Sequence, residues 1–166
     1  MLVLGIDPGT AIMGYSVLQA DRGTQVITYG VLRTPAGLAP HLRLEQLFSG
    51  VEKLIATHQP DCLAIESLFF NNNAKTALSV GEARGVVLLA AARQGIDVFE
   101  YTPLQVKLAV TGQGRAVKDQ VGYMVKALLR LEEIPKPDDA CDALAIALCH
   151  LFSTQGLAGV VRGGKG

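Results

Sequence analysis

The sequence has no long run of apolar residues. Its longest uninterrupted runs, VVLLAAA from Val86 and ALAIALC from Ala143, hold seven residues each, whereas a membrane-spanning helix needs about 20. The N-terminus lacks a basic flank and reaches Asp7 within a few residues, which does not fit a secretory signal. We therefore expect a soluble, cytoplasmic protein with no membrane partner.

Cysteine is also scarce. The three cysteines, Cys62, Cys141 and Cys149, lie in apolar segments and lack the C-x-x-C spacing of a zinc site. Their odd number and apolar surroundings indicate reduced, buried thiols in a cytosolic compartment. This excludes a disulfide framework as the basis of the fold.

Two familiar catalytic patterns are missing. The segment TGQGRAVK, residues 111–118, lacks the G-x-x-x-x-G-K-[ST] spacing that binds nucleotide phosphates. No Ser-His-Asp set is apparent, because His41, His58 and His150 lie in helical contexts. Neither a P-loop nor histidine-based nucleophilic catalysis is predicted.

The net charge is zero, but the charges are unevenly distributed. Between residues 104 and 130, a single acid, Asp119, faces five basic residues: Lys107, Arg115, Lys118, Lys126 and Arg130. A solvated helix face would explain this run, and so would a surface that binds a polyanion. The glycine loop before Lys118 also exposes backbone N–H groups, and with Arg115 and Lys118 it is a candidate DNA phosphate contact.

The apolar pattern predicts an α/β fold. Short runs punctuated by Gly and Pro predict strands over 2–7, 14–19, 25–33, 62–66 and 97–102. Helical spacing predicts helices over about 42–58, 73–94, 116–130 and 137–152. A strand meander followed by alternating helices and strands implies a five-stranded mixed sheet covered by helices. We expect one domain over residues 1–154 and a glycine-rich, flexible C-terminal tail over residues 155–166.

Four carboxylates stand where a divalent-metal site would need them. Asp7 and Glu66 each close an apolar strand, and Asp139 and Asp142 share one face at the start of the last helix. Alternative roles are turn initiation for Asp7 and a salt bridge for Glu66. Asp138 is the natural N-cap of the helix. Burying like charges together is costly without a cation, so the set favours a site for oxygen-loving ions such as Mg²⁺ or Mn²⁺.

Two divalent ions in such a site would activate a water for displacement at phosphorus. Phe69 and Phe70 follow Glu66 closely, in a segment that we predict to be a loop. Core packing is the usual role of a loop phenylalanine. Because two occur in a row beside the acids, one of them is a candidate for stacking on an unpaired base.

Several segments together resemble the RuvC family of bacterial Holliday junction resolvases. These are GIDPGT, AIES with Phe69 three residues on, GEARGVV, VFEYTPLQVK, TGQGRAVKDQV and DDACDALAIALCH, in order over residues 2–152. The resemblance implies a ribonuclease H-like fold, helices on both faces of the sheet and a homodimer with two active sites. It also implies symmetric nicking of two opposing strands of a four-way junction, and work with the RuvA and RuvB branch-migration proteins in recombination and repair.

The resemblance also assigns site residues. By position, Asp7, Glu66, Asp139 and Asp142 match the metal-binding catalytic acids, with two Mg²⁺ or Mn²⁺ ions per site. Phe69 matches the base-stacking aromatic, and Lys107 and Lys118 match DNA-contacting lysines. The apolar helix after Asn73 is a plausible dimer surface.

Two other classes of protein share some of these features. Sugar kinases and actin-like phosphotransferases also begin with a strand and an Asp-x-Gly-Thr turn, but they usually need a duplicated domain, for which 166 residues are too few. A non-catalytic junction-binding scaffold needs basic residues and no carboxylate cluster. We therefore favour the endonuclease.

Overall fold

The computed structural model describes residues 1–67 and 74–162, and they contain one five-stranded sheet. The strand order is β3-β2-β1-β4-β5. The β1–β2 and β2–β3 pairs are antiparallel, whereas β1–β4 and β4–β5 are parallel. The strands are β1 (Leu2–Asp7), β2 (Ile12–Ala20), β3 (Thr24–Arg33), β4 (Cys62–Glu66) and β5 (Asp97–Tyr101). The predicted mixed sheet is therefore confirmed.

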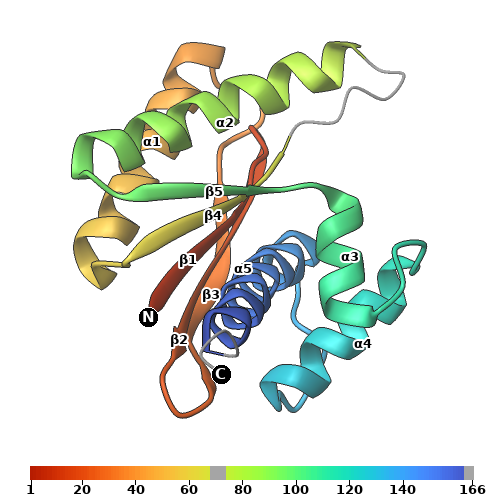
Figure 1. Ribbon diagram of the computed structural model, residues 1–166. Helices are drawn as coiled ribbons and strands as arrows, with labels where there is room; N and C mark the ends of the chain where they lie inside the picture. The colour runs from red at the N-terminus through yellow and green to blue at the C-terminus, as the bar shows by residue number, and fades with distance from the viewer. Residues whose placement is uncertain (68–73, 163–166) are drawn as a thin grey trace.

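Helices cover both faces of this sheet (Figure 1). On one face lie α1 (Pro40–His58) and α2 (Ala74–Gln94). The other face carries α3 (Pro103–Thr111), α4 (Lys118–Leu129) and α5 (Asp138–Arg162). None of the helices in the described part of the chain combines the length and the apolar character needed to cross a membrane.

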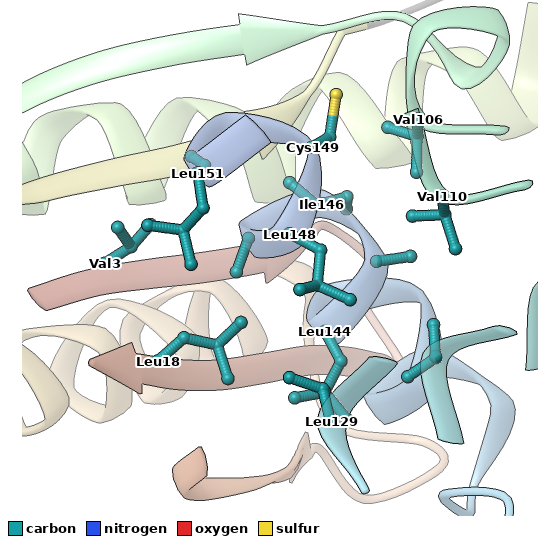
Figure 2. Close-up of a cluster of buried hydrophobic side chains, with 14 of the residues drawn as sticks. Val3, Leu18, Val106, Val110, Leu129, Leu144, Ile146, Leu148, Cys149 and Leu151 are labelled. Carbon is teal, nitrogen blue, oxygen red and sulfur yellow. The ribbon is translucent and has the colours of Figure 1, made fainter. Parts of the chain in front are cut away.

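The alternation of side chains along β1 explains why its run is continuously apolar. Val3 is buried on the α5 side, whereas Leu4 and Ile6 are buried on the side of α1 and α2. Figure 2 shows Leu144 and Leu148 of α5 among the buried side chains on the same side of the sheet as Val3. A strand buried on both faces has no polar alternation, so its sequence reads as one apolar run.

Helix α5 lies unusually close to β1 and β2. A Cβ atom at Gly14 would overlap the backbone carbonyl oxygen of Asp139, and one at Gly5 would overlap that of Ala143. The Ser16 hydroxyl donates to the same Ala143 carbonyl at 2.8 Å. The two glycines thus allow the helix that carries Asp139 and Asp142 to rest on the strand that ends in Asp7.

The structure corrects the predicted helices in three places. Helix α3 was missed, although Thr102 and Gln105 form a capping box at its start and Pro103 fits its first turn. Helix α5 continues to Arg162, beyond the predicted end at Phe152, and includes Gly156 and Gly159. It begins at Asp138, so this residue lies in the first turn and is not the N-cap. The flexibility of the tail over 155–166 stays a prediction.

Candidate active site

Asp7 and Glu66 lie at neighbouring strand ends. Strands β1 and β4 are parallel and pair with each other up to Ile6 and Ile65, so each acid directly follows the last residue of this ladder. The carboxyl ends of parallel strands meet at the same edge of a sheet. The fold therefore places these two half-buried acids side by side, as the sequence predicted.

The first turns of α5 bring further acids to this edge. Asp7 pairs with Gly14 of β2, and the backbone of Asp139 lies directly against Gly14. Asp142, one turn further along α5, keeps 35% of its side chain exposed. The site is thus assembled from two strand ends and one helix that are far apart in the sequence.

Burial and neighbouring carboxylates make ionisation unfavourable for Asp7, Glu66 and Asp142. Burial, and then the charges of Glu66, Asp142 and Asp139, raise the pKa of Asp7 to about 7. Burial and the charge of Asp142 also raise the pKa of Glu66. Burial raises the pKa of Asp142 as well, although a hydrogen bond from Lys118 opposes the shift. The cluster is therefore reluctant to ionise fully without added positive charge.

Lys118, the first residue of α4, supplies some of that charge. Its Nζ lies 3.1 Å from Oδ2 of Asp142 and 3.2 Å from Oδ2 of Asp138. Partial burial lowers the pKa of Lys118, but the two aspartates outweigh it and the pKa is raised overall. The sequence had predicted a DNA contact at Lys118 and had not predicted either ion pair.

Acids and lysines share one cavity of about 210 Å³. Glu66, Asp142, Lys107 and Lys118 line it together with apolar side chains of α3, α4 and α5: Val106, Val121, Ala145 and Ile146. Lys107 reaches the cavity because α3 packs beside α5. A concave site with apolar walls and a few converging charged groups is typical of an active site.

The donor set fits a hard divalent cation, since its available ligands are carboxylate oxygens. Within residues 1–67 and 74–162, however, no three His, Cys, Asp or Glu side chains are grouped closely enough to hold a metal ion. The ammonium of Lys118 already pairs with one of the carboxylates, that of Asp142.

The remaining predicted residues differ in where they lie. Asp139 is half-buried and close enough to raise the pKa of Asp7, but it does not line the cavity. Arg115 is exposed in the turn before α4 and also lies outside the cavity lining. Phe69 lies outside the described residues, so its stacking role stays a prediction.

One contact of Glu66 escaped the sequence analysis. Nη1 of Arg84, on α2, donates to the Glu66 carbonyl oxygen at 3.1 Å. The available signal was Arg84, one of two charged residues in the otherwise small and apolar segment GEARGVV. A largely buried arginine requires a partner, which the sequence alone does not identify.

Comparisons with known proteins agree with this geometry. A family model described as crossover junction endodeoxyribonuclease RuvC matches residues 3–150. The protein of that name from Desulforamulus reducens is 58% identical over 163 residues, 98% of this chain and 100% of the relative. A Thermus thermophilus RuvC structure has a TM-score of 0.87 at 35% identity, covering 94% of this chain and 96% of that chain.

A second T. thermophilus RuvC structure, in complex with a Holliday junction substrate, has a TM-score of 0.86 at 33% identity. It covers 94% of this chain and 96% of that chain. The ribonuclease H-like fold expected from the sequence is confirmed by these neighbours. The chain therefore belongs to the RuvC family of crossover junction endodeoxyribonucleases.

Proposed function

We propose that this chain resolves Holliday junctions by hydrolysing phosphodiester bonds symmetrically in two opposing strands, during DNA recombination and repair. The observation that carries the proposal is that half-buried Glu66 and Asp142 line one cavity with Lys107 and Lys118. Asp7, at the end of the neighbouring strand β1, lies close enough for the charges of both acids to raise its pKa. Acids that ionise reluctantly suit cation binding, and lysines beside them suit a phosphate. The RuvC relative bound to a Holliday junction supports the choice of substrate.

The proposed cofactor is Mg²⁺ or Mn²⁺, with two ions per site, held by Asp7, Glu66, Asp139 and Asp142. Bound divalent ions would supply an activated water and charge stabilisation for the leaving oxygen. Lys118 and Lys107 line the same cavity and would bind the phosphate that is cut. The apolar side chains that line the cavity, such as Val106 and Ile146, would limit the access of bulk water to it. A lower local dielectric strengthens these charge interactions.

Two cuts in opposing strands require two active sites, so we propose a homodimer. Leu78 and Leu89 on α2 are exposed, at 68% and 54%. Large apolar side chains left exposed on one helix are typical of an interface. RuvA and RuvB are proposed as partners from the family resemblance.

Cleavage of labelled DNA tests the proposal. A four-way junction and a linear duplex of the same sequence are incubated with Mg²⁺, Mn²⁺ or a chelator, and the cuts are mapped. We expect paired, symmetric, metal-dependent nicks in the junction and none in the duplex. Cleavage of both substrates, or of neither, would contradict the assignment.

Two variants extend this experiment. Asp7→Asn and Glu66→Gln keep the shape of each side chain but remove its charge, so we expect cleavage to be lost while junction binding persists. Strong cutting by Asp7→Asn would refute its role. Junction binding by the wild type without any cutting would favour the scaffold, and phosphoryl transfer from a nucleotide would favour the kinase-like class.

A further inference from the structure

Arg84 joins helix α2 to the ends of two strands. Its side chain is only 11% exposed, and its guanidinium makes two contacts. Nη1 donates to the backbone carbonyl oxygen of Glu66 at 3.1 Å, and Nη2 forms an ion pair with the carboxylate of Glu100 on β5. One rigid fork thus connects the last residue of β4 with β5.

Glu66 lies at the end of the sheet, where it still pairs with Tyr101 of β5 but no longer with β1. The pairing of β1 with β4 ends at Ile6 and Ile65, so Glu66 is beyond that ladder. On its other side, the next residue, Ser67, donates its N–H to the Tyr101 carbonyl at 2.8 Å. Arg84 and β5 therefore fix the Glu66 backbone from two directions, while the Glu66 side chain lines the cavity.

The same helix also contacts the segment after Asp7. The hydroxyls of Ser79 on α2 and Thr10 in the β1–β2 turn are 2.7 Å apart. Thr34 donates its hydroxyl to the Thr10 carbonyl, also at 2.7 Å. Helix α2 therefore touches both strand-end segments that carry the proposed ligands, although it supplies no acid to the cavity lining.

We propose that Arg84 is a positioning residue, which orients Glu66 for metal binding by fixing its backbone to β5 and α2. This inference rests on the proposed function, because it assumes that Glu66 is a metal ligand. The groups that orient a ligand matter nearly as much as the ligand itself, and losing one typically costs roughly 10- to 100-fold in metal affinity or activity.

The test first measures Mn²⁺ binding without DNA, by titration calorimetry or by the electron paramagnetic resonance signal of free Mn²⁺. It then measures junction cleavage at saturating DNA. We expect Arg84→Gln to weaken Mn²⁺ binding roughly 10-fold or more and to raise the Mn²⁺ needed for half-maximal cleavage by a similar factor. Arg84→Lys keeps the charge but not the fork, so its effect should be intermediate. Junction binding in chelator should not change.

Arg93→Gln is the matched control. Arg93 lies on the same helix and pairs with Glu52 at 3.2 Å, away from the cavity. We expect wild-type Mn²⁺ binding from this variant. Wild-type Mn²⁺ binding by Arg84→Gln, or an equal loss in Arg93→Gln, would overturn the inference.

Two further results keep the test decisive. If Arg84→Gln does not fold, Glu100→Ala can replace it, because it removes the carboxylate that pairs with Arg84 and changes only a half-exposed side chain. This variant should also weaken Mn²⁺ binding. Wild-type Mn²⁺ binding by Glu100→Ala would then count against the inference. A wild-type protein that itself neither binds Mn²⁺ nor cuts the junction would instead refute the proposed function.

Discussion

The ammonium of Lys118 lies 3.1 Å from the carboxylate of Asp142, a proposed metal ligand. The protein thus carries its own cation at the acid cluster. A metal ion that binds Asp142 has to compete with this ion pair, because both use the same carboxylate. Lys118 freed from Asp142 would then be available to a DNA phosphate in the same cavity.

Lys118→Ala should therefore separate metal binding from cleavage. We expect Mn²⁺ to bind the variant more tightly than the wild type, since a competing cation is gone. Cleavage should nevertheless fall, on the order of 100-fold, because a charge that stabilises the reacting phosphate is lost. Calorimetry without DNA measures the first effect, and single-turnover cleavage measures the second.

Lys126→Ala is a suitable control, as Lys126 lies near the far end of α4 and outside the cavity lining. A wild-type cleavage rate in Lys118→Ala would remove Lys118 from the site. Weaker Mn²⁺ binding would show that the lysine supports the ligands and does not compete with the metal.

The pKa of Asp7 predicts how stability depends on pH. Its folded-state pKa of about 7 exceeds its ordinary value of 3.8. Between about pH 4 and pH 7, the folded state therefore holds a proton that the unfolded state has lost, so stability falls as pH rises. Asp7→Asn cannot ionise, so without metal it should be more stable than the wild type at neutral pH. The difference should vanish towards pH 4.

Urea denaturation in chelator across this pH range measures the effect, at about 1.4 kcal/mol for each unit of pKa shift. Asp97→Asn, which makes the same substitution at an exposed position on β5, is the control. Parallel pH profiles of Asp7→Asn and the wild type would contradict the assigned pKa. Added Mn²⁺ should stabilise the wild type and not Asp7→Asn.

The sequence predicted the central strands β1 and β4 well because both are buried on both faces of the sheet. The runs that end in Asp7 and Glu66 contain only apolar residues and glycine before the acid, and no helical period competes with that pattern. Helix α3 was missed because its signal is local: Thr102, Pro103 and Gln105 define its start, whereas its nine residues are too few for a clear period.

The acids of the site were predictable from their positions, but their partners were not. Asp7 and Glu66 close apolar strands, and that alone marks them as unusual. The pairing of Lys118 with Asp142 joins the start of α4 to the start of α5, and the Arg84 contact joins α2 to β4. Such contacts depend on how helices pack on the sheet, which no spacing along the chain encodes.

Phe69→Ala tests the predicted stacking role. Loss of an aromatic surface that stacks on a base costs about 1–3 kcal/mol of binding. We expect cleavage of the junction to fall while the thermal midpoint of unfolding stays near that of the wild type. Phe70→Ala is the matched variant and should show the opposite pattern. A large drop in the thermal midpoint of Phe69→Ala would show that Phe69 belongs to the core.

Gly14→Ala tests whether the close approach of α5 to β2 sets the position of the acids. The added methyl group would overlap the Asp139 carbonyl, and backbone cannot yield as a flexible side chain does. We expect a loss of about 1–3 kcal/mol in the free energy of unfolding, typical of overpacking. Because α5 must move to relieve the overlap, Mn²⁺ binding should weaken as well.

Gly23→Ala provides the comparison, since a Cβ atom there meets nothing within 4 Å. Its stability should stay within about 0.5 kcal/mol of the wild type. Urea denaturation and calorimetry distinguish three outcomes for Gly14→Ala. Loss of both stability and Mn²⁺ binding supports the packing role, whereas loss of stability alone would show that the acids adapt to a displaced helix. Wild-type stability would show that the backbone at Gly14 is not closely packed, because an overlap of this kind cannot form without cost.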